Sequence, residues 1–337
     1  MRVAALGRTH WLYDAIELIA ARGHDVVMIG TSASAPEYRR HPADFTALAA
    51  RLGCPGFVAS SLRSADVVAH LASSQAEIAI SVNWPTLITA DTRVHFPRGV
   101  LNAHAGALPR YRGNACPNWA ILNGEPSVGV TIHEMVDELD AGPILAQEHL
   151  SLSESDYIGD VYARLDECIP RLFADVIDGL AADTLRAQPQ SLDPADALRC
   201  HPRRAEDGHI RWTASAVEIA RLVRASAEPF AGAQAAFEAE RLIVWRARVH
   251  RDDTRRVGVP GQIVGVDRAV GSVYVLCGDG VLELQELELG GVRGSAAQFL
   301  SSTRDRLTSP DVGDLMALQR RVAEMEAHLA RVASNDR

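Results

Sequence analysis

The first 150 residues alternate short aliphatic runs with stretches in which apolar residues recur every three or four positions. The aliphatic runs predict strands over Arg2–Gly7, Asp25–Gly30, Glu77–Val82 and Val100–His104. The second pattern predicts helices over Leu12–Arg22 and Pro42–Leu52, and again over 158–172. Because strands and helices alternate, we expect an α/β fold, a mostly parallel Rossmann-like sheet with helices on both faces.

The pattern changes after residue 180, where the chain becomes polar, aperiodic and rich in proline, as is typical of a linker. One helix then follows over Ser215–Ala225. Several short strands come after it: Leu242–Val249, Gly261–Val266, Ser272–Cys277 and Val281–Leu289. These elements predict a small, OB-like β-barrel as the C-terminal domain. We therefore expect a first domain over 1–190, a linker over 191–212 and a β-rich domain over 213–300.

The tail, 311–337, has its own periodicity. Apolar residues stand at 315, 318, 322, 325, 329 and 332, a three-four alternation of the kind that pairs helices. The pattern favours a helix that joins two copies of the chain into a homodimer. A helix that packs on its own second domain explains so short a repeat equally well.

The charge distribution argues against a nucleic-acid partner. The formal net charge is −9, and all 34 basic residues are arginines. Residues 1–200 carry 15 arginines against 24 carboxylates, and the remaining residues carry 19 of each. A protein that binds nucleic acid usually has a basic surface to neutralise phosphates.

Composition and cysteine usage point to a reduced, aqueous compartment. The chain has no run of 18 apolar residues, so no membrane helix is expected, and MRVAALGRTH lacks the apolar core of a secretory signal. We therefore expect a cytoplasmic protein. Five scattered cysteines without a CxxC pair favour buried thiols over disulfides or a zinc site, and no metal is expected.

Several common motifs are missing, and one polar cluster remains. The sequence contains no GxGxxG, GxxxxGK[ST], GxSxG or HExxH pattern. Asn102 and His104 stand two apart at the end of a predicted strand, so they share one side of it, where ligands of parallel sheets bind. Asp140 follows a later strand, 129–135. An amide, an imidazole and a carboxylate suit acyl transfer, although a structural histidine is the commoner explanation of Asn-x-His alone.

The stretch LNAHAGALPRYRGNACPNWAILNGE (101–125), with DELDAGPI (137–144), closely resembles the 10-formyltetrahydrofolate-dependent formyltransferases. This family includes methionyl-tRNA formyltransferase-like enzymes and sugar N-formyltransferases, and the sequence is closest to the latter. Its motif is Asn-x-His-x-Ser-x-Leu-Pro-x-x-Arg-Gly with an aspartate downstream. The resemblance continues in ISVNWPTLI (80–88), RRAEDGHIRW (203–212) and LVRASAEPFAGA (222–233). Ala107 stands where serine is usual.

The resemblance implies 10-formyltetrahydrofolate as co-substrate and a catalytic set of Asn102, His104 and Asp140 in the first domain. His104 would be the base, Asn102 would stabilise an oxyanion, and Asp140 would hold the imidazole tautomer. The co-substrate would be bound by residues on three segments: Ser81, Asn83, Trp84, Leu87, Leu101, Glu138 and Leu139. The acceptor would be bound mainly by the loop after the catalytic strand: His10, Arg110, Tyr111, Arg112, Asn114 and Trp119.

Three functions compete on this basis. Formyl transfer to the amino group of a nucleotide-linked amino sugar, or a similar small amine, is favoured by the acidic charge balance. Formylation of methionyl initiator tRNA is the alternative, and it would require a basic groove. A non-catalytic family member is the third possibility, and the intact Asn102, His104 and Asp140 set argues against it.

Overall fold

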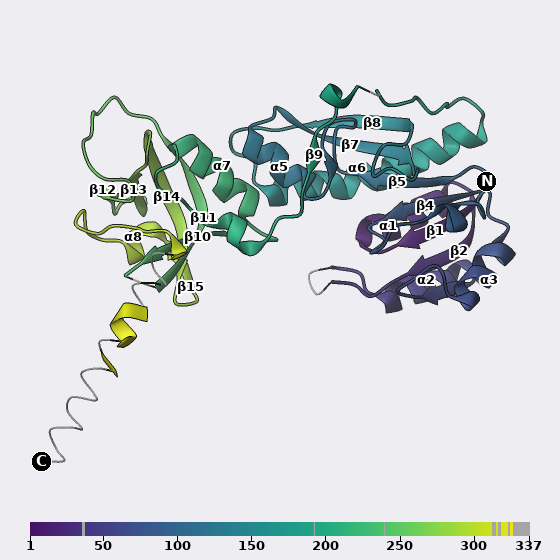
Figure 1. Cartoon of the computed structure of the whole chain (residues 1–337), viewed down its shortest axis with the longest axis horizontal. Coiled ribbons are helices and arrows are strands. Elements are labelled where there is room, and N and C mark those ends of the chain that lie inside the picture. The colour runs from purple at the N-terminus through teal and green to yellow at the C-terminus, as the bar shows by residue number, and fades with distance from the viewer. Residues whose placement is uncertain are drawn as a thin grey trace, which may run out of the picture. The chain divides into compact units, whose positions relative to one another are not determined.

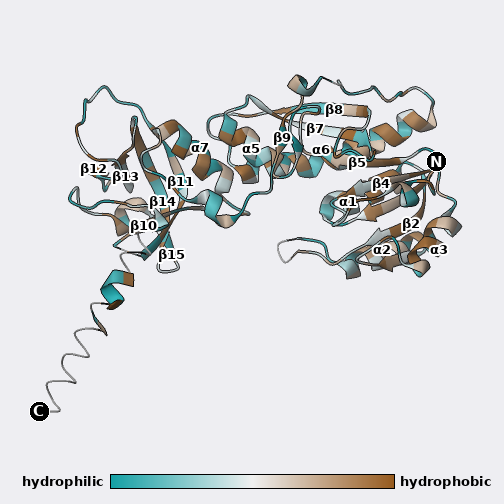
Figure 2. Ribbon diagram, viewed as in Figure 1, coloured by the Kyte–Doolittle hydropathy of each residue, from teal (hydrophilic) through white to brown (hydrophobic). Residues whose placement is uncertain are grey.

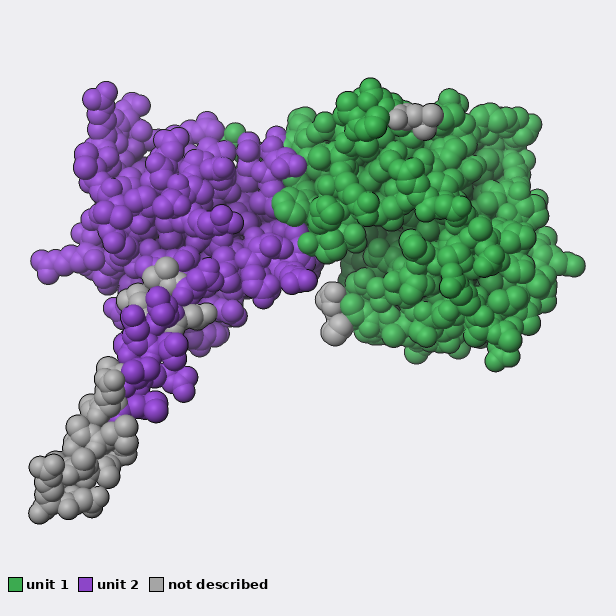
Figure 3. Space-filling model, in the orientation of Figure 1, with its two compact units in different colours: residues 1–120, 125–154, 160–202 green, residues 121–124, 155–159, 203–337 purple. Residues whose placement is uncertain are grey.

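The computed structural model of the chain describes residues 1–35, 38–191, 193–238, 240–311, 315, 318–322 and 324–325. Its contacts divide the chain into two compact units (Figure 3). The first consists of 1–120, 125–154 and 160–202, and the second of 121–124, 155–159 and 203–337. The division at 202/203 falls within the stretch 191–212 that the sequence indicates as a linker.

The first unit contains a seven-stranded sheet in the order β3-β2-β1-β4-β5-β7-β8 (Figure 1). Pairing is parallel from β3 to β5 and antiparallel from β5 through β7 to β8. The expected α/β fold with a mostly parallel sheet is therefore confirmed. The strands are β1 (Arg2–Gly7), β2 (Asp25–Thr31), β3 (Gly56–Val58), β4 (Ile78–Val82), β5 (Val100–His104), β7 (Ser127–Glu134) and β8 (Ile144–Ser151).

Helices flank this sheet and bury their apolar stripes. All five residues of β4 are buried, as is typical of a central parallel strand covered on both faces. Figure 2 shows the hydrophobic residues concentrated on these strands. The helices are α1 (His10–Ala21), α2 (Pro42–Leu52), α3 (Ala65–Ser74), α4 (Ala90–Arg93), α5 (Cys116–Asn123) and α6 (Ile158–Ala181).

A small two-stranded sheet lies beside the loop that follows β5. Its strands, β6 (Arg112–Gly113) and β9 (Arg199–Cys200), pair in parallel. A 3₁₀ turn, η1 (Pro194–Asp196), precedes β9. Further upstream, the backbones of Gln188 and Ile144 exchange two hydrogen bonds of 2.7 Å each. The end of the first unit is therefore anchored at two points near the carboxyl end of β5 and the start of β8.

The second unit contains a six-stranded antiparallel sheet in the order β10-β11-β14-β13-β12, with β15 paired to β14. The β-rich C-terminal domain predicted from the sequence is confirmed. Ser215 begins α7 with a capping box, in which its hydroxyl accepts from the Glu218 amide and Glu218 accepts from the Ser215 amide. The elements are η2 (Ala205–Gly208), α7 (Ala216–Ser226), β10 (Ala233–Phe237), β11 (Glu240–His250), β12 (Ile263–Asp267), β13 (Ser272–Leu276), β14 (Val281–Leu289), β15 (Val292–Ser295) and α8 (Ala296–Phe299).

The heptad-patterned tail is described only in part. Leu315, Leu318, Val322 and Met325 are exposed. The remaining two apolar positions of the repeat, 329 and 332, lie outside the described residues. Within the described part of the chain, none of the helices is both long and apolar enough to cross a membrane.

Candidate active site

His104 is the last residue of β5, and its buried imidazole has a defined partner on each nitrogen. Nε2 lies 2.6 Å from the backbone carbonyl oxygen of Tyr111. A carbonyl oxygen only accepts, so Nε2 carries the proton and donates it. In the neutral imidazole Nδ1 then carries the lone pair, and Nδ1 faces Oδ2 of Asp140 at 3.6 Å. From the sequence, Asp140 was expected to hold the tautomer of His104. In the structure, the contact of hydrogen-bond length is made by the carbonyl of Tyr111.

Asp140 lies in the turn between β7 and β8, and its backbone is left-handed, with φ of 52°. Oδ2 accepts a hydrogen bond of 2.8 Å from the amide of Gly113 in β6. Its side chain is only 10% exposed. Two residues on, a Cβ on Gly142 would collide with the carbonyl oxygen of Glu134, so this tight turn requires glycine there. The turn thus directs a buried carboxylate at His104.

Asn102 is joined to this pair by His133, a residue that sequence reasoning missed. Asn102 and His133 are register partners on the antiparallel strands β5 and β7. Nδ2 of Asn102 lies 3.2 Å from Nε2 of His133, which is 3.7 Å from Oδ1 of Asp140. A histidine in the mostly apolar strand 129–135 was the available signal. The structure therefore brings Asn102, His104 and Asp140 together, with His133 as a fourth member.

The environment of His133 keeps its imidazole neutral. Burial, together with the nearby His104, lowers the pKa of His133 from 6.5 to about 4. Nδ1 of His133 lies 2.8 Å from the carbonyl oxygen of Glu134, to which it donates. His133 is therefore neutral at physiological pH, with a lone pair on Nε2 that accepts from Asn102.

Gln190 and Arg112 connect the Asp140 turn to the loop after β5. The amide nitrogen of Gln190 lies 2.8 Å from the carbonyl oxygen of Asp140 and 2.7 Å from that of Gly142. Its Oε1 accepts a 2.9 Å hydrogen bond from Arg112. Arg112 also contacts Glu138 at 3.1 Å. Sequence reasoning predicted Arg112 as an acceptor ligand and missed Gln190, whose position in an aperiodic segment gave no signal.

A pocket of about 110 Å³ adjoins Asp140 and His133. Three of the residues predicted to bind the co-substrate, Leu87, Glu138 and Leu139, line it. Most of the surface of its wall is apolar, as is usual for a small-molecule site, and its polar groups include the carboxylates of Asp137, Glu138 and Asp140. The remaining lining residues are Ile88, Thr89, Arg93, Met135 and Val136.

The other residues predicted to bind the co-substrate lie at or near the ends of β4 and β5. Ser81 is the register partner of Asn102. Asn83 follows β4 with a left-handed backbone, at φ of 53°. Trp84 is packed in the hydrophobic core and Leu101 is fully buried. Ser81 therefore lies beside Asn102 in the sheet and Leu101 directly precedes it in β5, but none of these four residues lines the pocket beside Asp140.

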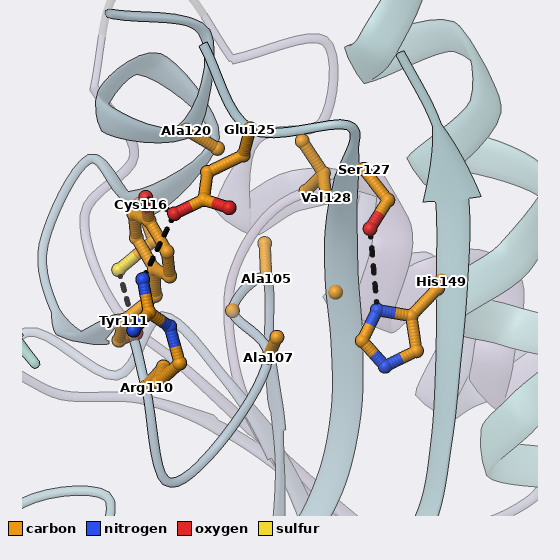
Figure 4. A pocket seen from close by; sticks show the side chains of 12 residues that line it. Ala105, Ala107, Arg110, Tyr111, Cys116, Ala120, Glu125, Ser127, Val128 and His149 are labelled. Atoms are coloured by element: carbon orange, nitrogen blue, oxygen red, sulfur yellow. Dashed lines mark hydrogen bonds and ion pairs between the residues drawn. The ribbon is translucent and has the colours of Figure 1, made fainter. Parts of the chain in front are cut away.

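A second pocket, of about 140 Å³, is lined in part by the loop that follows His104 (Figure 4). Ala105, Gly106 and Ala107 form part of its wall. Arg110 and the Tyr111 hydroxyl both donate to Glu125, at 2.9 and 2.7 Å. The rest of its lining comes from α5, β7 and β8: Cys116, Ala120, Ser127, Val128, Gly129 and His149. Two predicted acceptor residues therefore line this pocket.

The remaining predicted acceptor residues are dispersed. His10 pairs with Asp166 at 2.6 Å, and Arg39 contacts both. The amide of Asn114 donates to Cys200 at 3.2 Å, and the indole of Trp119 donates to the His201 carbonyl at 2.9 Å. The contacts described for these three residues, which for Asn114 come from its backbone, are made with residues other than His104 and Asp140.

The chain belongs to the formyl transferase family. Residues 1–177 match the family described as formyl transferase, and residues 203–304 match the formyl transferase C-terminal domain. The first match covers more than half of the chain and contains the cluster around His104.

Solved structures share this fold at low sequence identity. HypX from Aquifex aeolicus, in complex with tetrahydrofolic acid, is 17% identical with a TM-score of 0.58, over 90% of this chain and 47% of HypX. This chain thus spans about half the length of HypX. The N-formyltransferase from Helicobacter canadensis, with folinic acid and dTDP-3-aminofucose, is 14% identical with a TM-score of 0.60, over 85% and 99% of the two chains. WlaRD, a sugar 3N-formyl transferase, is 14% identical with a TM-score of 0.62, over 87% and 98%.

Proposed function

We propose that this protein transfers a formyl group from 10-formyltetrahydrofolate to the amino group of a small amine, namely a nucleotide-linked amino sugar. The observation that carries the proposal is the convergence of Asn102, His104 and Asp140 beside a mostly apolar pocket. Membership of the formyl transferase family supports the reaction class.

The pocket beside Asp140 suits a folate. A pterin is flat and apolar on its faces, with hydrogen-bonding groups along its edge. Leu87 and Leu139 offer apolar surface, and Glu138 offers a carboxylate, on the wall of one pocket. The folates in the solved structures of HypX, the Helicobacter canadensis enzyme and WlaRD support a folate as the co-substrate. Of the residues outside this pocket, we propose that Ser81 and Asn83, at the end of β4, contact the folate, and that the buried Trp84 and Leu101 support the strands beneath it.

10-Formyltetrahydrofolate would supply an electrophilic formyl carbon to this site. As the new amide bond forms, the bond from that carbon to N10 would break, and N10 of the departing tetrahydrofolate would take up the proton that the amine has lost. His104 is placed to take the proton that the acceptor amine loses, and the available atom is Nδ1, because Nε2–H is committed to Tyr111. The resulting imidazolium would face the carboxylate of Asp140 at 3.6 Å, which stabilises the charge. The end of β5 thus provides the base, His104, and the turn between β7 and β8 provides its counter-ion, Asp140.

Asn102 is placed to stabilise negative charge that develops on the formyl oxygen. One N–H of its amide is directed at His133, so the orientation of the side chain is fixed before substrate binds. A donor that is already oriented costs no reorganisation during the reaction. We propose that the second N–H of Asn102 donates to this oxygen.

The proposed acceptor is small because the protein offers little to a polyanion. The first 200 residues carry 15 arginines against 24 carboxylates. A nucleotide diphosphate needs only one or two arginines. Of the two on the loop, the side chain of Arg110 is 55% exposed and that of Arg112 is 13% exposed, so we propose Arg110 as the first contact. The dTDP-amino sugar in the Helicobacter canadensis structure supports this acceptor class.

The test is a direct comparison of acceptors. Amino-sugar nucleotides and charged initiator tRNA are each incubated with 10-formyltetrahydrofolate at about 0.15 M salt. At this ionic strength, weak contacts between arginines and phosphates are screened as they are in a cell. Mass spectrometry then detects the gain of one formyl group. We expect formylation of at least one amino-sugar nucleotide. Efficient tRNA formylation without sugar activity would replace the proposal with the tRNA alternative, and no transfer to any amine would support a non-catalytic member.

A further inference from the structure

Gln190 lies 50 residues beyond Asp140 in the chain, yet its side chain is packed against the turn that carries Asp140. It is 8% exposed. Its amide nitrogen serves two backbone carbonyls of the turn, those of Asp140 at 2.8 Å and Gly142 at 2.7 Å. The segment that carries it is held in place two residues earlier, where the backbones of Gln188 and Ile144 exchange two hydrogen bonds.

We infer that Gln190 is a positioning residue for the formyl transfer proposed above, which holds the Asp140 turn so that its carboxylate faces His104. The effect on catalysis rests on the proposed function, whereas the support of the Asp140 turn rests on the contacts of Gln190 alone. The turn needs such support because its backbone is left-handed at Asp140, a conformation that costs free energy for any residue with a Cβ.

The orientation of the Gln190 amide is determined by its neighbours. Arg112 can only donate, so the atom facing it at 2.9 Å must be the acceptor Oε1. The two carbonyl oxygens can only accept, so they must face the NH₂ group. No other side chain of this length offers two donors and one acceptor in this arrangement, and a glutamate carboxylate would meet both carbonyls without a proton to donate.

Gln190 also connects the two halves of the catalytic pair. Arg112 directly follows Tyr111, whose carbonyl binds Nε2 of His104. The path from Arg112 through Gln190 to the Asp140 carbonyl therefore joins the loop that holds His104 to the turn that holds Asp140. A second, independent link is the hydrogen bond from the Gly113 amide to the Asp140 carboxylate. Removing Gln190 leaves this second link intact, so misplacement rather than unfolding is expected.

The experiment compares Gln190→Met, which keeps the length and loses the hydrogen bonds, with Gln188→Met as a matched control. Gln188 is exposed and belongs to the same segment. We expect Gln190→Met to lower kcat by on the order of 10- to 100-fold, the usual cost of misplacing a catalytic group by about 1 Å. Gln188→Met should keep the wild-type kcat. On an Asp140→Asn background, Gln190→Met should cause no further loss, because its effect runs through Asp140.

Gln190→Glu adds a second measurement, the pH dependence of its rate, which a purely structural role of Gln190 would not change. At neutral pH the introduced carboxylate cannot donate to the carbonyls, and after protonation it can donate one hydrogen bond. The rate of this variant relative to wild type should therefore rise as the pH falls. A ratio that is independent of pH contradicts the inference, as does a Gln190→Met variant as active as Gln188→Met.

Hydrogen exchange separates this inference from the proposed function. Amides of the 137–142 turn should exchange faster in Gln190→Met than in wild type. In Gln188→Met their exchange rates should equal those of the wild-type protein. This outcome needs no activity, so it decides the structural part even if the wild-type protein transfers no formyl group. Unchanged exchange in Gln190→Met overturns the inference, whereas an inactive wild-type protein with faster exchange in the variant overturns only the proposed function.

Discussion

The amide nitrogen of Asn102 lies 3.2 Å from Nε2 of His133, across the paired strands β5 and β7. Because Nδ1 of His133 donates to the Glu134 carbonyl, Nε2 must accept, and the Asn102 amide can be oriented in only one way. A buried histidine that stays neutral thus fixes the orientation of the proposed oxyanion donor.

This neutrality has a consequence for stability. The folded-state pKa of His133 is about 4, below the ordinary 6.5, so the unfolded chain takes up the proton first as the pH falls. The free energy of unfolding should therefore decrease between pH 6.5 and about 4, by on the order of 3 kcal/mol, and level off below that. Urea denaturation at a series of pH values measures this. In His133→Gln this part of the decrease should disappear, and in His149→Gln, at an exposed histidine, it should remain. If the free energy of unfolding depends on pH equally in wild type, His133→Gln and His149→Gln, the decrease does not come from His133.

Substitution of the catalytic residues should remove turnover and keep donor binding. His104→Asn removes the proposed base and should lower kcat by roughly 100- to 10,000-fold. Asn102→Ala and Asp140→Asn should each abolish most turnover as well, because these groups act on the transition state. Steady-state kinetics and calorimetry with a non-transferable folate provide the two measurements. A His104→Asn protein that keeps more than about a tenth of the wild-type rate would exclude His104 as the base.

Gly106→Ala should lower activity although it leaves every catalytic residue in place. A Cβ at this position would collide with the Tyr111 carbonyl and with Nε2 of His104, the two groups whose hydrogen bond sets the tautomer. Either the loop or the imidazole must move, so we expect kcat to fall by at least about tenfold. If kcat stays at the wild-type value, the Tyr111 contact does not control the base.

The tail should mediate self-association. Leu315, Leu318, Val322 and Met325 present exposed apolar side chains at the spacing of a helix-pairing stripe. A second copy of the chain, with the same stripe, would cover them. Light scattering should give a dimeric mass for the full chain and a monomeric mass for a chain that ends near residue 310. An unchanged mass after truncation contradicts the prediction and favours packing of the tail on its own domain.

The sequence predicted the parts of the fold that rest on local periodicity. Three elements begin and end in the structure where their patterns do: Arg2–Gly7, Pro42–Leu52 and Val100–His104. A strand buried on both faces has a continuous run of apolar residues, and an amphipathic helix has an apolar stripe, so both can be recognised in the sequence. The two-residue strand Arg199–Cys200 has neither signal. Its pairing depends on a partner far along the chain, which no local pattern encodes.

The same distinction holds for the site. The two-residue spacing of Asn102 and His104 placed both on one side of a strand, and the resemblance supplied Asp140. His133 and Gln190 were missed because each acts through a partner 31 or 50 residues away. A single polar residue in a strand or an irregular segment has no period, so only the register and the folded turn reveal its role.

The pairing of β6 with β9 determines where this chain could be divided. A fragment that stops at residue 190 would retain all seven strands of the main sheet, but it would leave the backbone of Arg112 and Gly113 without its partner strand. Gly113 is the residue whose amide binds the Asp140 carboxylate. Any exchange of the second unit for another domain, in evolution or in engineering, would therefore keep this support of the geometry around His104 only if the junction lies beyond Cys200. The interchangeable module of this protein starts later than its change in composition indicates.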